Sequence, residues 1–232
     1  ALSSAASDVY KRQIIRKIIG GFVMEFILAS SSPRRKQLLS TIISNFDIIP
    51  SDIDENNLKK LEPNPQKLAE KLSYEKAYSI FTDKYKENNE YTVIGSDTLV
   101  SFGNIILGKP KDRDDAIRIL KLLQGNSHDI YTGTTVIIKK EHSIIFETRV
   151  NKSTVYFKNM SYYDICSYVD TKEPMDKAGA YAVQGIGKVY LKGYDGDYNS
   201  IVGLDTHMIK SIFEKYNLSL IHISEPTRLQ LI

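Results

Sequence analysis

The chain contains 232 residues, of which 42% are hydrophobic and 25% are charged, so it can bury a substantial core as a single domain. No apolar run reaches the roughly 18 residues of a membrane-spanning helix, and we therefore expect no membrane partner. The net charge of +3 comes from basic residues within positions 1–23. Because the remainder is neutral overall, composition gives no reason to expect a nucleic-acid partner.

The two ends of the chain differ in character from its middle. Residues 1–23 are interpreted as a non-native or disordered extension, because their first part resembles translated linker sequence and no turn joins them to the first predicted strand. The tail at 219–232 is interpreted as non-native on the same grounds. A mitochondrial presequence is the alternative for the N-terminal part, since residues 10–21 are basic, partly apolar and free of acidic side chains. The expected domain spans residues 24–218.

The first predicted elements are a buried strand and an amphipathic helix. The strand covers residues 26–29, and the helix begins after Ser32 with Pro33 at its first position. Its apolar stripe extends to Phe46. The next elements are a strand at 46–53, a long helix at 68–85, a buried strand at 92–94 that leads into a turn at Gly95-Ser96-Asp97, and a hairpin at Gly103-Asn104 joining 99–102 to 105–107.

The second half of the chain also alternates between helices and strands. Ser161 is expected to cap a helix, because an acidic residue follows it at the third position. The loop at 170–187 is long for a compact domain, which favours a functional role. The predicted elements are a helix at 116–123, antiparallel strands at 128–139 and 143–157, the capped helix to 169, a strand at 189–191, a turn at 195–197 and a last helix ending at 216. Together they predict a mixed-sheet α/β fold.

Several common catalytic frameworks are absent from the sequence. Cys166 is the only cysteine, which excludes an internal disulfide and a cysteine-based metal site and favours a reducing, cytoplasmic location. The four histidines do not have the spacing of metal ligands. The chain has neither a P-loop nor a dinucleotide-binding glycine motif, so an ordinary P-loop NTPase and a dinucleotide-dependent enzyme are disfavoured.

Two adjacent arginines, Arg34 and Arg35, fall in the first turn of the first predicted helix. A helix N-terminus already carries partial positive charge and unpaired N–H groups, so arginines there are repelled unless an anion binds beside them. Their forked guanidinium groups suit phosphate. The segment therefore predicts a phosphate site, with a solvated basic turn as the alternative.

Lys76 and Lys109 are further candidate anion ligands. On a helix of 3.6 residues per turn, Lys76 falls between Leu72 and Ile80 inside the apolar stripe. A lysine there must either snorkel to solvent or meet a partner. Lys109 lies in a loop stiffened by the following proline, but exposed lysines are common and its position alone is weak evidence.

Asp97 and Glu55 are the candidate carboxylates. Asp97 is expected at the end of a buried strand, where open α/β sheets bind ligands, or alternatively as a loop residue that bonds its own backbone. Asp54 and Glu55 follow another predicted strand, and their charge makes sense if a divalent cation bridges carboxylates and phosphate. An ordinary acidic loop is the alternative reading of this pair.

A series of short motifs connects these candidate residues along the chain. They are Ile27-Leu28-Ala29-Ser30-Ser31-Ser32-Pro33-Arg34-Arg35, Ser51-Asp52-Ile53-Asp54-Glu55, Glu75-Lys76-Ala77, Gly95-Ser96-Asp97-Thr98, Leu107-Gly108-Lys109-Pro110, Thr132-Gly133-Thr134, Glu173-Pro174-Met175-Asp176-Lys177-Ala178-Gly179-Ala180-Tyr181 and Gln184-Gly185. In this order they resemble the Maf family of nucleoside triphosphate pyrophosphatases, first known as septum-formation inhibitors. The chain departs from the family pattern at Asp205, because the family usually has proline after the glycine and leucine that stand here as Gly203-Leu204.

The resemblance implies two lobes around a nucleotide-binding cleft and hydrolysis of a nucleoside triphosphate to the monophosphate and pyrophosphate. Gln184 matches a site residue of the branch that resembles the dTTP/UTP pyrophosphatases. A Mg²⁺ or Mn²⁺ cofactor and a homodimer are further implications, and a regulator of cell division that binds nucleotide without turnover is the alternative. The implied site residues are the catalytic Asp97, Glu55 and Lys109, the substrate-binding Ser30, Ser32, Arg34, Arg35, Lys76, Thr98 and Gln184, and the metal ligands Asp97 and Glu55.

Overall fold

The structure is a computed structural model that describes residues 24–86 and 89–218. The expected extension at 1–23 and tail at 219–232 lie outside the described residues. The strands are β1 (Glu25–Leu28), β2 (Asp47–Ile48), β3 (Tyr91–Phe102), β4 (Ile105–Leu107), β5 (Ser127–Lys140), β6 (Ser143–Phe157) and β7 (Leu191–Asp195). The helices are α2 (Pro33–Ser40), α3 (Glu55–Leu61), α4 (Pro65–Lys84), α5 (Arg113–Leu123), α6 (Tyr162–Asp170), α7 (Tyr198–Val202) and α8 (Thr206–Lys215), with 3₁₀ segments at Glu173–Asp176, Ala178–Ala180 and Ile186–Tyr190.

Within the described part of the chain, the strands form one mixed sheet of seven strands. Their order is β2-β1-β3-β5-β6-β7, with β4 paired to β3. β1 runs parallel to β2 and β3, whereas the other pairs are antiparallel. The predicted mixed-sheet α/β class is therefore confirmed, as is the long antiparallel pair formed by β5 and β6.

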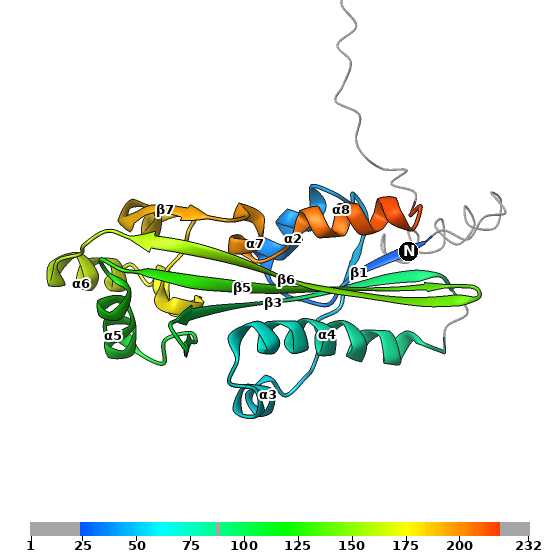
Figure 1. The fold of residues 1–232 in the computed structure, drawn as a ribbon, viewed down its shortest axis with the longest axis horizontal. Helices are drawn as coiled ribbons and strands as arrows, with labels where there is room; N and C mark the ends of the chain where they lie inside the picture. The colour runs from blue at the N-terminus through cyan, green and yellow to red at the C-terminus, as the bar shows by residue number, and fades with distance from the viewer. Residues whose placement is uncertain (1–23, 87–88, 219–232) are drawn as a thin grey trace, which may run out of the picture.

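Alternate residues of β3 face two different helix layers. Val93 packs in one cluster with Ala77 and Ile80 of α4. Ile94, the next residue, packs in another cluster with Ile209 of α8. Neighbouring side chains of a strand point to opposite faces, so a strand with both faces covered is apolar at successive positions. Helices α4 and α8 accordingly lie on opposite faces of the sheet (Figure 1).

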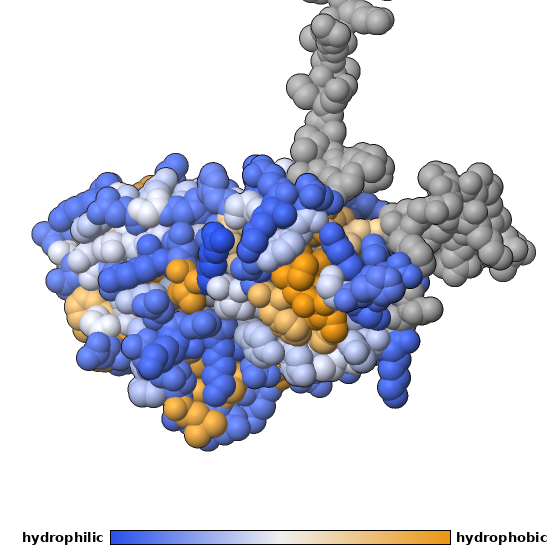
Figure 2. Space-filling model, turned by 45° about the vertical axis from the view of Figure 1, so that its right-hand side comes forward, coloured by the Kyte–Doolittle hydropathy of each residue, from blue (hydrophilic) through white to orange (hydrophobic). Residues whose placement is uncertain are grey.

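The end of the molecule remote from the β5–β6 turn has its own core. Helices α5 and α6 pack there around Leu120, Phe157 and Tyr168. The face shown in Figure 2 is mostly hydrophilic and carries a few separate apolar patches. Of the helices that the structure describes, none has both the length and the apolar character needed to cross a membrane.

Several elements differ from the sequence prediction. Most of the strand predicted at 189–191 belongs to the 3₁₀ segment Ile186–Tyr190, with β7 following it, and the last predicted helix is divided into α7 and α8. Helix α2 ends at Ser40 rather than near Phe46, although Ile42 and Ile43 remain buried in the turn after it. The strand predicted at 46–53 is reduced to the two residues of β2. Helix α3 is absent from the prediction, because none of its residues is buried and no apolar stripe therefore marks it.

Strand β3 continues through Gly95, where the sequence predicts a turn. It is a single strand of 12 residues, and Asp97 lies near its middle rather than at its end. A Cβ on Gly95 would lie 2.5 Å from the carbonyl oxygen of Ser73 in α4. The close approach of a helix therefore explains this glycine, which the sequence alone attributes to a turn.

Candidate active site

A cavity of about 1050 Å³ opens beside the middle of β3. On one side of β3, β1 pairs with residues 91–94 and β4 pairs with residues 100–102. Between these two ladders, in the described part of the sheet, no strand pairs with residues 95–99 on that side. Asp97 and Thr98 line the cavity from this gap. An opening beside the strands of an α/β sheet is a common place for a ligand.

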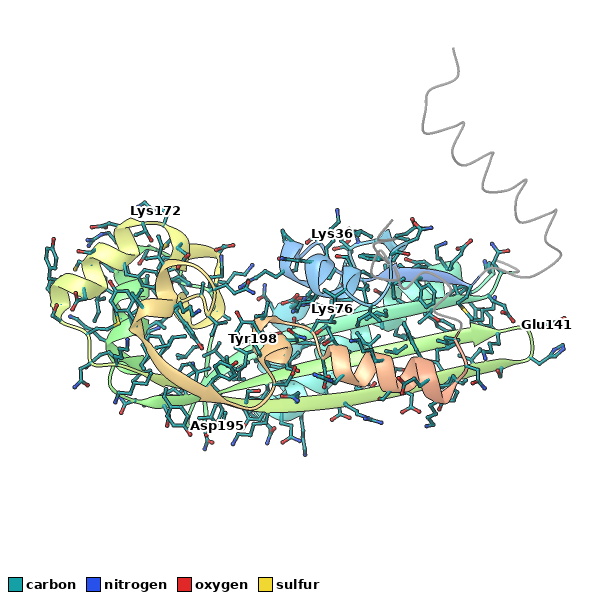
Figure 3. The ribbon with its side chains drawn as sticks, turned by 90° about the horizontal axis from the view of Figure 1, so that it is seen from above. Lys36, Lys76, Glu141, Lys172, Asp195 and Tyr198 are labelled. Carbon is teal, nitrogen blue, oxygen red and sulfur yellow. The ribbon has the colours of Figure 1, made fainter. Side chains whose placement is uncertain are left out.

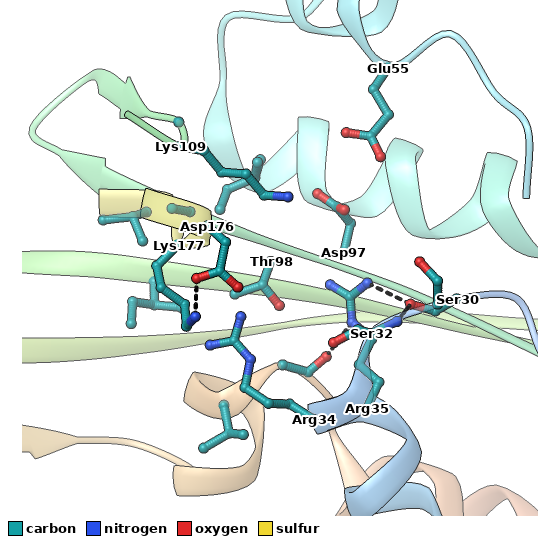
Figure 4. A pocket seen from close by; sticks show the side chains of 18 of the residues that line it. Ser30, Ser32, Arg34, Arg35, Glu55, Asp97, Thr98, Lys109, Asp176 and Lys177 are labelled. Carbon is teal, nitrogen blue, oxygen red and sulfur yellow. Dashed lines mark hydrogen bonds and ion pairs between the residues drawn. The ribbon is translucent and has the colours of Figure 1, made fainter. Parts of the chain in front are cut away.

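Arg34 and Arg35 reach the cavity from the N-terminus of α2. The Arg35 guanidinium donates through Nε to the carbonyl oxygen of Gly203 at 3.0 Å and through Nη1 to Ser30 Oγ at 3.2 Å. Ser30 Oγ also accepts the backbone N–H of Ser32 at 3.2 Å. Ser32 occupies the cap position but its side chain makes no capping bond. Bonds from Arg35 thus fix the loop between β1 and α2, while the helix N-terminus and Arg34 face the cavity (Figure 4).

A chain of ion pairs lies on the α4 side of the cavity. The Nζ atom of Lys76 lies 2.5 Å from Asp97 Oδ1 and 2.7 Å from Glu55 Oε1. The side chains of Lys76 and Asp97 are only 9% and 10% exposed. Lys76 therefore meets a partner rather than snorkelling. It lies in the interior of the molecule, in contrast to Lys36 at the periphery (Figure 3).

The charges in this cluster shift the pKa values of its members. Partial burial raises the pKa of Glu55, but the hydrogen bonds and charges of Lys59 and Lys76 outweigh this effect and hold the pKa at about 2. Burial lowers the pKa of the Arg35 guanidinium, although the negative charges of Asp97 and Glu55 oppose it. Glu55 is consequently negative and Arg35 positive at neutral pH.

Two glycines of the sheet allow α4 to hold Lys76 next to Asp97. Gly95 lies against Ser73 and Ala77 of α4, and a Cβ on Gly133 would collide with the carbonyl group of Ala69. Gly133 is the cross-strand partner of Asp97. Because neither strand presents a side chain at these points, the helix approaches the sheet closely enough for a lysine to reach a strand carboxylate.

Asp97 and Glu55 are the carboxylates of the cavity wall that could share a divalent cation. Among the described residues, no three or more His, Cys, Asp or Glu side chains are grouped so that they could hold a metal ion. Mg²⁺ commonly takes only one or two protein carboxylates and completes its coordination with water and substrate phosphates. The two carboxylates therefore fit a cation that binds together with a phosphate ligand.

Comparison with known proteins places this arrangement in a family. A family profile described as "Maf-like protein" matches residues 25–216. The chain belongs to the Maf family. It is 42% identical to the dTTP/UTP pyrophosphatase of Caldicellulosiruptor bescii over 84% of this chain and 96% of that protein. The dTTP/UTP pyrophosphatases of Acetivibrio thermocellus and Clostridium botulinum (strain Eklund 17B) are 39% and 41% identical, over 86% and 83% of this chain and 98% and 99% of their own lengths.

All but one of the predicted site residues of this Maf-family chain line the cavity. They come from the β1–α2 loop, α2, α3, α4, β3 and the segment after β4, which are far apart in the sequence. Figure 4 shows most of these side chains around one space. The lining residues among those predicted are Ser30, Ser32, Arg34, Arg35, Glu55, Lys76, Asp97, Thr98 and Lys109.

Gln184 is the predicted site residue that does not line the cavity. Its side chain is exposed, whereas Tyr181 and Val183 of the same loop are buried and form part of the wall. The motif match identifies the loop but carries no information on which of its side chains points inward. The structure therefore brings the loop to the site without bringing Gln184.

Three charged lining residues are missing from the sequence prediction. Lys59 lies on α3, and its Nζ atom lies 2.8 Å from Glu55 Oε2. The prediction misses Lys59 because α3 itself has no sequence signal. Asp176 and Lys177 form an ion pair at the other end of the cavity. Both belong to one of the motifs that resemble the Maf family, so their charge was the signal that could have identified them.

Proposed function

We propose that this protein hydrolyses nucleoside triphosphates to the monophosphate and pyrophosphate, with dTTP and UTP as favoured substrates. The observation that carries the proposal is the charge of the cavity, because six lysine and arginine side chains line it against three carboxylates among the described residues. Such a surplus favours a polyanionic ligand. The relatives named dTTP/UTP pyrophosphatase, at 39–42% identity, support the reaction and the choice of base.

The basic side chains are proposed to bind the phosphates. Arg34 and Arg35 would contact them at the N-terminus of α2, and Lys76 and Lys109 would contact them from α4 and from the segment after β4. Negative charge builds up on the departing pyrophosphate as the bond between the α-phosphorus and the bridging oxygen breaks. Positive groups that are already in place stabilise this charge without reorganising, which is the main source of catalysis in reactions of this type.

Asp97 is proposed to take the proton of the attacking water, with Glu55 assisting. The ion pair with Lys76 fixes the orientation of the Asp97 carboxylate in the cavity. Thr98 follows Asp97 on the strand and also lines the cavity, where it would contact the substrate together with Ser30 and Ser32.

The same two carboxylates, Asp97 and Glu55, would hold a Mg²⁺ or Mn²⁺ ion. A bound ion would offset charge on the phosphates and help to orient them. Lys76, which contacts both carboxylates, supplies one positive charge at this place from the protein itself. The biological purpose that we propose is the removal of noncanonical or modified nucleotides before polymerases use them.

A panel of nucleotides tests the reaction. The purified protein is incubated with dTTP, UTP, dATP and GTP in the presence of Mg²⁺ or Mn²⁺, and pyrophosphate and orthophosphate are measured separately. We expect pyrophosphate as the phosphate product, released fastest from dTTP and UTP. Orthophosphate with a nucleoside diphosphate would contradict the bond that is broken, and nucleotide binding without either product would favour a non-hydrolytic regulator instead.

A further inference from the structure

The loop between α6 and β7, which contains 3₁₀ segments at Glu173–Asp176, Ala178–Ala180 and Ile186–Tyr190, forms one wall of the cavity. Tyr181 and Val183 of this loop line the cavity, and both are buried. Residues 181–185 belong to no helix or strand of the described chain. Tyr181 and Val183 pack in a core cluster, and the backbone around them is held in addition by side chains that bond to it.

Glu173 makes two such bonds at one end of the loop. Its carboxylate accepts the backbone N–H of Ile186 at 3.0 Å and that of Gly187 at 2.8 Å. Burial raises the pKa of Glu173, but these two backbone donors and the hydroxyl of Tyr168 outweigh it and lower the pKa below its ordinary value. The carboxylate is therefore ionised at neutral pH and acts as a strong acceptor.

Tyr168 extends the network to the other end of the loop. Its hydroxyl donates to Glu173 Oε2 at 2.8 Å and accepts the backbone N–H of Ala182 at 3.1 Å. The Tyr168 side chain is 1% exposed, and its ring packs against that of Tyr190 with centroids 5.4 Å apart. A single carboxylate thus holds the backbone on both sides of Val183.

Gly185 shows how closely the carboxylate fits the loop. Its φ of +90° favours glycine, and a Cβ at this position would collide with Oε1 of Glu173. Any side chain here would therefore both strain the backbone and displace the carboxylate from its N–H donors. The loop conformation and the position of Glu173 depend on each other.

We propose that Glu173 and Tyr168 are positioning residues that set the affinity and base preference of the cavity by holding Tyr181 and Val183 in place. Neither Glu173 nor Tyr168 lines the cavity, so both act through the loop. The inference rests on the proposed function, because the base of a nucleotide is the part that an apolar wall would meet. A wall held firmly favours the base that fits it, since a poorly fitting base cannot displace it.

The test compares Tyr168→Phe and Glu173→Gln with the matched variant Tyr190→Phe. Tyr168→Phe keeps the buried ring and removes only the hydroxyl that bridges the network. Tyr190→Phe removes a hydroxyl from the ring beside it, outside the network. Pyrophosphate release from UTP and from GTP gives KM, kcat and the preference between the two bases, while thermal unfolding gives the stability of each variant.

Hydrogen exchange provides a readout that does not depend on activity. We expect the amide of Ala182 to exchange about tenfold faster in Tyr168→Phe, and those of Ile186 and Gly187 to do so in Glu173→Gln, because each loses roughly one hydrogen bond. The KM for UTP should rise about fivefold to tenfold with kcat changed less than about twofold, and the preference for UTP over GTP should shrink by a similar factor. Tyr190→Phe should match the wild type in its amide exchange rates and in its KM, kcat and base preference.

Two results would overturn the inference. Faster exchange with an unchanged KM and base preference would mean that the network holds the loop but not the substrate. A fall in kcat in proportion to lost thermal stability, with KM and preference intact, would show a purely structural role. Absence of pyrophosphate release from the wild type would instead overturn the proposed function, and the exchange data would still show whether the network fixes the loop. If Glu173→Gln does not fold, Tyr168→Phe carries the test alone.

Discussion

Asp97 is a charged residue in the middle of a buried strand, where an uncompensated carboxylate would be costly. Lys76 compensates it from α4, and Glu55 compensates the same lysine from α3. Lys76 therefore balances a carboxylate whose side chain is only 10% exposed, where charges are screened less than in bulk water. This is the condition under which a carboxylate interacts strongly with a reacting group.

Asp97→Asn tests the role of this carboxylate. The amide keeps the shape of the side chain and loses its charge, so pyrophosphate release should fall by about a hundredfold or more. Stability in urea should fall by only about 1–2 kcal/mol, because Lys76 keeps its bond to Glu55. The control is Asp83→Asn on the exposed side of α4, which should change neither quantity. Release at the wild-type rate by Asp97→Asn would contradict the proposed mechanism.

His128 is a buried histidine whose protonation is coupled to folding. It is 3% exposed, and its Nε2 atom lies 2.7 Å from the hydroxyl of Tyr181. Within the described residues its Nδ1 atom has no hydrogen-bond partner. Burial lowers the pKa of His128 to about 4, and the nearby charge of Asp129 opposes this only in part. The imidazole is therefore neutral in the folded protein at neutral pH.

Stability should consequently fall as the pH is lowered from 6.5 toward 4, because the unfolded chain binds a proton that the folded chain excludes. The shift of the pKa from 6.5 to about 4 corresponds to at most about 3 kcal/mol. His128→Gln cannot titrate and should give a flatter curve of unfolding free energy between pH 6.5 and 4.5. His142→Gln, at a side chain that is 87% exposed, should follow the wild type. A wild-type curve as flat as that of His128→Gln would show that His128 does not contribute.

At the residue scale, the sequence predicts chemistry best where a residue conflicts with its surroundings. Arg34 and Arg35 at a helix N-terminus and Lys76 in an apolar stripe are such conflicts, and all three line the cavity. Gln184 presents no conflict, and its orientation depends on a loop conformation that Glu173, eleven residues earlier in the chain, helps to hold. Sequence reasoning therefore identifies the loop but gives no information on which way the Gln184 side chain points.

At the scale of elements, the contact between α4 and β3 controls the geometry of the ion-pair chain. Gly95→Ala tests it, because the added Cβ would lie 2.5 Å from the carbonyl oxygen of Ser73 and 2.7 Å from the amide nitrogen of Ala77. The helix must then move away from the sheet and carry Lys76 with it. We expect a loss of about 1–3 kcal/mol in urea unfolding together with slower pyrophosphate release.

Gly193→Ala is the matched control for this prediction. It lies in β7, where an added Cβ meets nothing within 4 Å, and both stability and rate should stay near those of the wild type. A Gly95→Ala protein that is less stable but fully active would show that the position of Lys76 is less critical than its ion pairs indicate.

Elements with a strong pattern are predicted well. Helices α4, α5 and α6, the β3–β4 hairpin and the β5–β6 pair all lie where periodicity, caps and turn residues place them. Helix α3 is missing from the prediction because it lies on the surface and has no buried residue. The break predicted in β3 is wrong because a glycine serves equally well for a turn and for close packing of a helix, and only the tertiary structure distinguishes the two.

At the scale of the whole molecule, charge is distributed unevenly. The chain from residue 24 to 218 is neutral overall, yet the described side chains that line its cavity carry a surplus of three positive charges. Attraction of a nucleotide should therefore be local and screened by salt. We expect the KM for UTP to rise with NaCl concentration while kcat stays nearly constant, and Arg34→Gln to reduce the dependence. Sucrose at equal osmolality is the control, and a KM independent of salt would contradict the electrostatic argument.

The long strands under the cavity determine which parts of the molecule can move. Strand β3 pairs with β5 from Tyr91↔Lys139 to Ser101↔Asp129, and β5 pairs with β6 along its whole length. These three strands therefore extend without a break beneath both ends of the molecule. A hinge through the site would have to bend all three hydrogen-bonded strands at once. A rearrangement on ligand binding would therefore fall to an element that rests on these strands with few anchors, such as α3, which has no buried residue. The sheet beneath such an element would keep its shape while the element moves, because its central strands are paired over most of their length.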